Sequence, residues 1–123
     1  MASERFSRDR RVRRRGEFKR VFDLSIRAKG RYLTILIAPN DGRAARLGIV
    51  ASRKLGDAVR RNRAKRLIRE VFRRIDAPPL GIDVVVIPRR ELFDADYPDF
   101  EADFRNTLKR CAARLPAPSD VVR

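Results

Sequence analysis

The stretch Val59–Arg74, VRRNRAKRLIREVFRR, determines how the rest of the sequence is interpreted. Apolar side chains in and just beyond it recur at spacings of three and four, the period of one helix face. This apolar stripe consists of Ala64, Leu67, Ile68, Val71, Phe72 and Ile75. Asp57 can cap the helix, and Pro78 and Pro79 end it. The stretch therefore predicts a helix from about Asp57 to about Ile75 with one buried face.

The other side of this predicted helix is cationic. With residues placed about 100° apart, the side away from the stripe is lined by Asn62, Arg66, Arg69 and Arg73, flanked by Arg63, Lys65 and Arg74. Glu70 is the only acidic residue from Arg60 to Arg74. Solvated helix faces usually mix charge signs, because like charges at i,i+4 are mildly destabilising. We therefore favour a nucleic-acid-binding face, with a merely solvated face as the alternative.

The composition of the whole chain agrees with a polyanionic partner. The 123 residues carry a formal net charge of +15 and are 43% hydrophobic, which fits a single folded domain. The candidate polyanions are nucleic acid and an anionic membrane surface. The N-terminus lacks the apolar run of a signal peptide, and no stretch approaches the roughly 20 apolar residues of a membrane span. A single cysteine, Cys111, excludes an internal disulfide. The sequence predicts a cytoplasmic, monomeric protein.

The order of elements predicts an α+β fold. Residues 1–15 are expected to form a flexible basic arm, residues 16–116 the RNA-binding domain, and residues 117–123 a C-terminal tail. Within the domain we expect, besides the basic helix, a helix over Glu17–Ser25, strands over Tyr32–Ala38, Leu47–Ser52 and Ile82–Ile87, and a last helix outlined by Phe100–Leu115. The order is α-β-β-α-β-α around a small central sheet. If the turn residues 39–42 form a hairpin, the first two strands are antiparallel.

Two further groups of residues suit RNA binding. Phe18 and Phe22 could stack on unpaired bases, although their spacing favours packing against the sheet. In the segment 52–56, Arg53 and Lys54 precede the basic helix and could hold a phosphate at its N-terminus, or the segment could be an ordinary polar turn. The sequence leaves these two interpretations of the segment equally open.

Catalytic residues are scarce. The chain has no histidine, and Cys111 falls on the apolar stripe of the last helix. Acidic residues that could hold a divalent metal are Asp94, Asp96, Asp99, Glu101 and Asp103. They better fit a solvated loop and the start of the last helix. We therefore expect a binding protein with no catalytic residue and no metal site of its own.

The segment Ala58–Glu70, AVRRNRAKRLIRE, closely resembles the signature of the bacterial ribonuclease P protein subunit. The similarity extends to Gly48–Gly56, to Glu17–Phe22 and to Asp83–Arg89, and covers about residues 11–115. The resemblance implies an α/β sandwich in which a left-handed β-α-β crossover breaks the usual right-handed rule. It also implies an auxiliary subunit of an endoribonuclease whose catalyst is RNA, so that Mg²⁺ serves the RNA rather than the protein.

The resemblance also implies the partners. The protein would bind the catalytic RNA and the single-stranded 5′ leader of precursor tRNA, assist removal of that leader, and broaden the range of substrates. The residues facing the catalytic RNA would be Arg61, Asn62, Arg63, Lys65, Arg66 and Arg69, joined on the charge pattern by Arg53, Lys54 and Arg73. Phe18 and Phe22 would lie beside the leader. Neither DNA nor a membrane would be a partner.

Two other classes of protein remain as alternatives on the sequence. A structural ribosomal protein would share the basic arm and the small α+β domain, but would bind ribosomal RNA without assisting cleavage. A DNA-binding regulator would place the basic helix in a major groove and would dimerise with a fixed half-site spacing. The sequence contains no dimer-forming heptad pattern.

Overall fold

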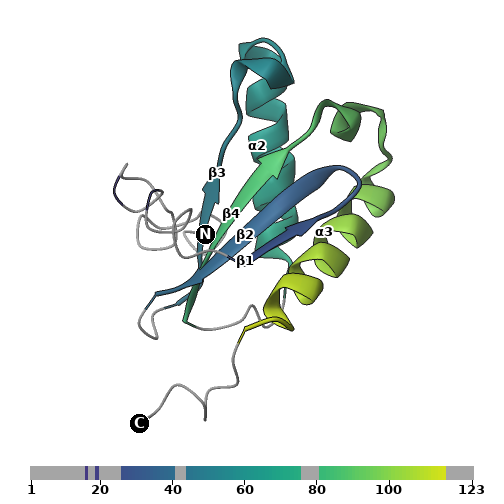
Figure 1. Cartoon of the computed structure of the whole chain (residues 1–123). Helices are drawn as coiled ribbons and strands as arrows, with labels where there is room; N and C mark the ends of the chain where they lie inside the picture. Colours follow the sequence, from purple (N-terminus) through teal and green to yellow (C-terminus); the bar gives the residue numbers. More distant parts are fainter. Residues whose placement is uncertain (1–15, 17–18, 20–25, 41–43, 76–80, 116–123) are drawn as a thin grey trace, which may run out of the picture.

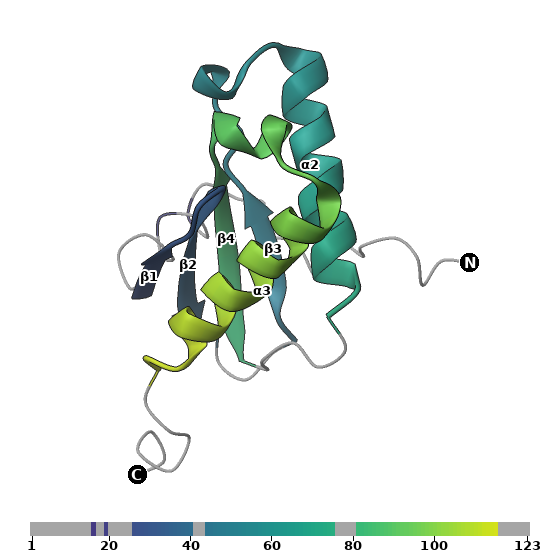
Figure 2. The same cartoon turned by 90° about the vertical axis from the view of Figure 1, so that its right-hand side faces the viewer.

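The fold is built on one four-stranded mixed sheet. The computed structural model describes residues 16, 19, 26–40, 44–75 and 81–115. The strands are β1 (Ile26–Lys29), β2 (Leu33–Pro39), β3 (Arg46–Ile49) and β4 (Ile82–Pro88), in the spatial order β1-β2-β4-β3. Helices α2 (Ala58–Arg73) and α3 (Tyr97–Ala112) pack on the same face of the sheet (Figures 1 and 2). The short 3₁₀ helices η3 (Arg53–Leu55) and η4 (Arg90–Asp94) precede them. The predicted α+β domain is confirmed.

β4 lies inside the sheet because its sequence, IDVVVIP, is apolar almost throughout. Val84, Val85 and Val86 are all fully buried. Val84 and Val86 belong to the main core beneath the helices, whereas Val85 joins Leu36 and Ala38 in a smaller apolar cluster. A continuous apolar run is the pattern of a strand that is buried on both faces.

The hairpin considered for the first two expected strands, over Tyr32–Ala38 and Leu47–Ser52, does not form. β2 and β3 do not pair, because β4 lies between them. β4 is antiparallel to β2 along its whole length, from Pro88 opposite Leu33 to Ile82 opposite Pro39, and is parallel to the shorter β3. Turn residues such as Pro39 and Asn40 predict that the chain reverses, but they do not determine which strand becomes the partner. The longer apolar strand makes more cross-strand pairs, and these stabilise a sheet.

β1 was not predicted from the sequence. Its four residues, IRAK, alternate in exposure, and only Ala28 is buried. The strand is held by its turn to β2, where the carboxylate of Asp103 on α3 accepts the N–H groups of Arg31 (3.0 Å) and Tyr32 (2.8 Å). Such support comes from residues far along the chain, so local patterning does not reveal it. The expected first helix, Glu17–Ser25, lies outside the described residues apart from Lys19.

The connection from β3 through α2 to β4 is a left-handed crossover. In Figure 1 both strands run upward and β4 lies to the right of β3, while α2 lies behind the sheet, as the turned view in Figure 2 shows. This confirms the handedness that the family resemblance implied, against the right-handed rule for parallel strands. The same connection places the segment between β3 and α2 beside the end of β4.

A buried polar network fastens the opposite end of the sheet. Asp83 on β4 accepts both Nε (2.8 Å) and a terminal nitrogen (2.7 Å) of Arg46 on β3. It also accepts the side-chain amide of Asn40, which follows β2, at 2.9 Å. Asn40 and Asp83 are almost fully buried. Because buried charges need partners, this network fixes the ends of β2, β3 and β4 relative to one another.

Candidate nucleic-acid interface

The position of α2 is fixed by a cap at one end and by the core along one side. The Asp57 side chain accepts the Arg60 N–H at 2.9 Å, as predicted for the N-cap. Gly56, with φ of 142°, makes the turn that leads from η3 into the helix. The buried residues of α2 are Ala64, Ile68, Val71 and Phe72. This confirms the predicted phasing of the helix, so its other sides face outward.

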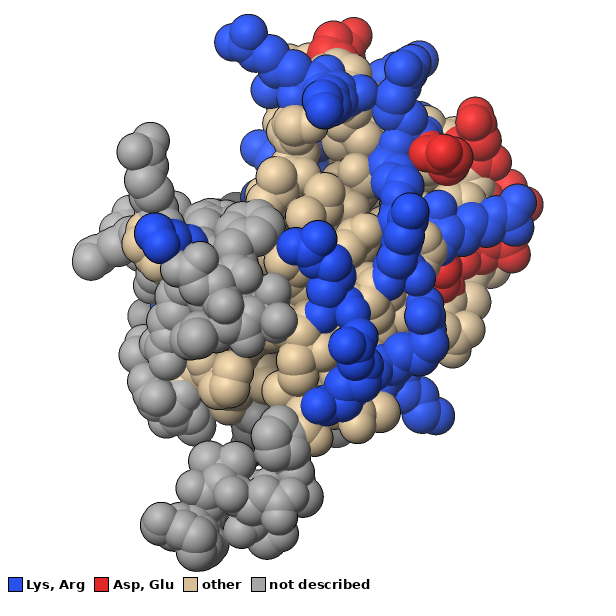
Figure 3. Space-filling model, in the orientation of Figure 1, with Lys and Arg blue, Asp and Glu red and all other residues tan. Residues whose placement is uncertain are grey.

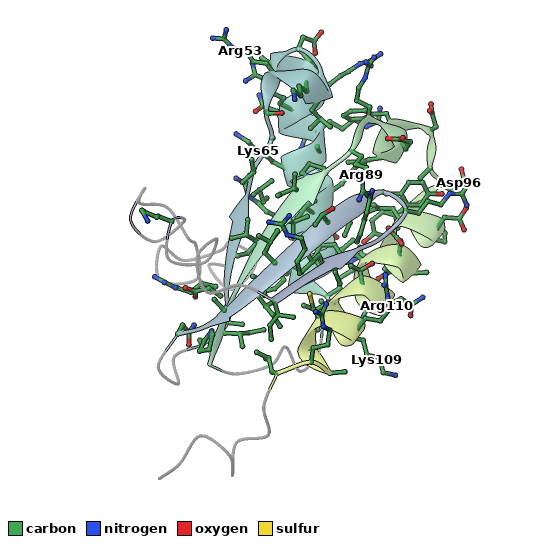
Figure 4. The ribbon with its side chains drawn as sticks, in the orientation of Figure 1. Arg53, Lys65, Arg89, Asp96, Lys109 and Arg110 are labelled. Carbon is green, nitrogen blue, oxygen red and sulfur yellow. The ribbon has the colours of Figure 1, made fainter. Side chains whose placement is uncertain are left out.

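The cations of α2 occupy three sides of the helix rather than one. Asn62, Arg66 and Arg73 are exposed on the side opposite the buried stripe, with Arg69 half-buried beside them. Arg61 and Lys65 are half-buried, and Figure 4 shows Lys65 beside β3. Arg63 faces the other flank, toward β4 and η4. The residues predicted from the signature are therefore brought together on one helix but point in different directions.

The positive charge is least compensated in the N-terminal half of α2. Arg60 and Arg61 lie in its first turn, where the helix dipole disfavours cations. Neither they nor Arg63, Lys65 and Arg66 form an ion pair with a carboxylate of the described residues. This arrangement costs stability in the free protein, and a bound anion would offset that cost.

At the other end of the helix, Glu70 moderates the charge. Its carboxylate contacts Arg73 at 2.6 Å and Arg74 at 2.7 Å. The hydrogen bond from Arg73 is the main reason that the pKa of Glu70 lies below its ordinary value. The charge of Arg73, which was predicted to bind RNA, is therefore partly neutralised by the Glu70 carboxylate. In this respect Arg73 differs from the cations in the N-terminal half of α2.

An open hollow of about 890 Å³ adjoins the N-terminal half of α2. Its cationic lining comes from Lys54, Arg60, Arg63, Arg89 and Arg90. Ser52 supplies a hydroxyl, and the aromatic ring of Phe93 lies 5.6 Å from the Arg60 guanidinium. Of the segment predicted to hold a phosphate, Lys54 lines the hollow, whereas Arg53 is exposed and does not line it; Figure 4 shows Arg53 at the top of the molecule.

Arg60, Arg89, Arg90 and Phe93 were missed as candidate site residues. Arg89 donates to the Gly30 carbonyl (2.7 Å) and to the Thr34 hydroxyl (2.8 Å), which hold its guanidinium beside the sheet. These residues reach the hollow because β3 and β4 are parallel, so the segments after both strands leave the sheet at the same edge. The run Pro88-Arg89-Arg90 would have indicated them had the parallel pairing been predicted.

The remaining predicted positions divide into residues that the structure places and residues that it does not describe. Phe18 and Phe22 lie outside the described residues. Cys111 is buried, and burial raises the pKa of its thiol, which contacts the carbonyl of Ile35 at 3.3 Å. Within the described ranges, no three His, Cys, Asp or Glu side chains are grouped so that they could hold a metal ion. In the same part of the chain, no helix combines the length and apolar character needed to cross a membrane.

Comparison with known proteins identifies the family to which the chain belongs. The family model named Ribonuclease P matches residues 6–112. The chain belongs to the ribonuclease P protein family. It is similar to the ribonuclease P protein component of Thermotoga maritima, with 39% identity over 113 residues, 88% of this chain and 97% of that protein. The corresponding protein of Pseudomonas entomophila is 36% identical over 121 residues, 97% of this chain and 91% of that protein.

Solved ribonuclease P proteins share the fold. The protein from Thermotoga maritima superimposes with a TM-score of 0.74 at 39% identity, covering 81% of this chain and 96% of that one. The Staphylococcus aureus protein gives a TM-score of 0.74 at 30% identity, covering 82% and 94%. Membership of the family identifies the chain as a protein component of an endoribonuclease and implies partnership with the ribonuclease P RNA.

Proposed function

We propose that this ribonuclease P protein binds the catalytic RNA through α2 and the 5′ leader of precursor tRNA through the adjoining sheet. The observation that carries the proposal is the uncompensated charge in the N-terminal half of α2, where the helix dipole and mutual repulsion both disfavour cations. The proposed residues are those predicted from the sequence, namely Arg53, Lys54, Arg61, Asn62, Arg63, Lys65, Arg66, Arg69 and Arg73. Phosphate oxygens of a folded RNA are suitable partners for such a group.

The hollow beside α2 supports a role in holding a single RNA strand. It combines cations, which suit the phosphate backbone, with the ring of Phe93, which suits a base. Phe18 and Phe22 are also proposed to contact the leader, as the family resemblance implies. Backbone contacts do not depend on base identity, so they would let one protein assist the processing of many precursors.

Catalysis is proposed to belong to the RNA. In this proposal Mg²⁺ is bound by the RNA, and the protein provides positive charge and an ordered path for the leader, acting as a monomer in the cytoplasm. A structural ribosomal protein, the alternative left by the sequence, has less support, because the relatives described above are ribonuclease P proteins.

The deciding experiment adds the purified protein to the catalytic RNA and precursor tRNA at low magnesium and follows cleavage of the 5′ leader. We expect strong stimulation at low magnesium and little at high magnesium, where cations in solution take over part of the screening. Absence of stimulation under both conditions would contradict the proposed function. Omitting the RNA is the control, and the protein alone should leave the precursor intact.

The role of α2 is tested by Arg66→Ala and Arg69→Ala. Each should weaken binding of the catalytic RNA and reduce the slope of log K against log salt by about 0.7 to 0.9, the value for one lost phosphate contact. The matched control is Arg105→Ala on α3, which removes the same charge from an exposed residue that pairs with Glu101. If all three variants change the slope equally, only total charge matters and α2 is not the binding surface.

A further inference from the structure

A second cationic surface lies at the edge of the sheet away from β3. We call it the β1–α3 strip, and its members are Arg27, Lys29, Arg31, Lys109, Arg110 and Arg114, all exposed. Figure 3 shows basic side chains continuing down this side of the molecule, while acidic ones gather toward the outer side of the upper half. None of the six forms an ion pair with a carboxylate of the described residues. The strip depends on the fold. Its α3 members belong to residues 75–123, a segment that carries a slight net negative charge when taken alone.

The strip is held together by hydrogen bonds that bring like charges near one another. Arg110 donates to the Lys29 carbonyl at 2.9 Å, and Arg114 donates to the Arg27 carbonyl at 2.6 Å. Cations at the end of α3 are favoured by the helix dipole, but this effect does not explain the cations on β1. Like charges on neighbouring elements repel, so their grouping costs stability unless an anion lies between them.

The same hydrogen bonds indicate what kind of partner the strip accepts. β1 is an edge strand, and an unpaired edge would invite a further strand from another protein. The guanidinium groups of Arg110 and Arg114 occupy the carbonyls of Arg27 and Lys29, so the edge is blocked against strand addition. A guanidinium that already donates to a carbonyl still has N–H groups for a phosphate. The chemistry therefore favours a nucleic-acid backbone over a peptide.

The strip is continuous with the hollow beside α2. Arg89 lines that hollow and also donates to the Gly30 carbonyl in the turn between β1 and β2. Figure 4 shows Arg89, Arg110 and Lys109 one below another along this side of the molecule. In the sheet, Arg27 lies opposite Leu36 and Lys29 opposite Thr34. The two cations are therefore on the sheet face that carries Leu36 and Val85, away from the helices.

We propose that the β1–α3 strip binds the phosphates of the 5′-terminal part of the precursor leader. This inference rests on the proposed function, in which the catalytic RNA lies on α2 and the leader crosses the sheet from that side. A strand that leaves the hollow over Arg89 reaches Lys29 and Arg27 at the far edge. Arginine side chains contact phosphates without reading base identity, so the strip extends the grip on the leader regardless of its sequence.

The test uses the double variant Arg27→Gln/Lys29→Gln. These two side chains make no hydrogen bond or ion pair among the described residues, and the carbonyls that receive Arg110 and Arg114 belong to the unchanged backbone. The variant should therefore fold. The reconstituted protein–RNA complex is titrated with precursor tRNAs whose leaders are shortened stepwise from the 5′ end. For the longest leaders, affinity should fall about tenfold and the salt slope should decrease by about 1.4, the value for two single-strand contacts.

The outcomes separate this inference from the proposed function. With short leaders, the double variant should bind as tightly as the unaltered protein, and a loss limited to long leaders supports the strip. A loss of equal size at every leader length, or no loss at all, overturns the strip as a leader site while the proposed function stands. If the unaltered protein gains no affinity with leader length, the proposed leader binding itself fails, and the strip fails with it. Arg105→Gln is the single-charge control and should show no dependence on leader length.

Discussion

Asp57 holds the first turn of α2 by accepting the Arg60 N–H at 2.9 Å. We expect Asp57→Ala to lower the free energy of unfolding by about 1 kcal/mol, because an orphan donor loses its partner. Urea denaturation followed by circular dichroism measures the change. Asp57→Asn is the matched control, since it keeps an acceptor at the same position and should retain most of the stability. Equal losses in the two variants would show that the charge matters and the hydrogen bond does not.

At the scale of single residues, the sequence predicted what depends on local geometry. The period of a helix is a local property, so Ala64, Ile68 and Val71 were placed in the core from spacing alone. The half-buried position of Arg61, whose Nε is buried without a hydrogen-bond partner among the described residues, depends instead on how closely α2 packs against the sheet. No spacing rule contains that information. The roles of Phe18 and Phe22 stay predictions.

At the scale of elements, Glu70 reduces the positive charge that α2 presents to RNA, and its ion pairs with Arg73 and Arg74 stabilise the helix. We expect Glu70→Gln to bind the catalytic RNA more tightly and with a steeper salt dependence, because Arg73 and Arg74 lose their anionic partner. Filter binding at several salt concentrations measures both effects. Glu101→Gln makes the same change of charge on α3, where the carboxylate pairs with Arg105 instead of an α2 side chain, and should have a smaller effect. A decrease in affinity for Glu70→Gln would mean that Glu70 orients the arginines for RNA.

The same substitution predicts a pH dependence. The hydrogen bond from Arg73 lowers the pKa of Glu70 in the folded protein. A lowered pKa contributes stability above the ordinary value of about 4.3, and this contribution is lost as the pH falls through the lowered value. The unaltered protein should therefore be more stable than Glu70→Gln at neutral pH and equally stable at strongly acidic pH. Urea unfolding over a pH series measures the difference, and a gap that persists in acid would assign it to another cause.

The pairing of the strands in the structure differs from what the sequence suggested. The existence of α2, α3 and three of the strands followed from apolar period and turn residues, which act over a few positions. The partner of each strand is decided across the sheet, and it determined the interface as well. Because the sequence did not suggest the parallel pairing of β3 with β4, the segments after these two strands were not expected to meet, and Arg89, Arg90 and Phe93 were overlooked.

At the scale of the whole molecule, the network around Asp83 holds three strands together. We expect Asp83→Ala to cost about 3–5 kcal/mol, because the largely buried guanidinium of Arg46 would lose its carboxylate and Asn40 would lose one of its three acceptors. Chemical denaturation measures the loss. The exposed pair of Arg105 and Glu101 is the comparison, and Glu101→Ala should cost no more than about 1 kcal/mol. A similar small cost for both substitutions would show that water reaches the Arg46 guanidinium once the Asp83 carboxylate is removed.

The position of β4 between β2 and β3 has a consequence for synthesis on the ribosome. β1 and β2 emerge in succession and can pair at once, but β3 has no neighbour until residues 82–88 have been added. At translation rates of roughly 5–20 residues per second, that wait lasts on the order of seconds. During it, the nascent chain already displays the cations of α2 while the sheet that must support the helix is incomplete. RNA that meets the emerging chain at this stage contacts the cations of α2 before the sheet that supports the helix is complete.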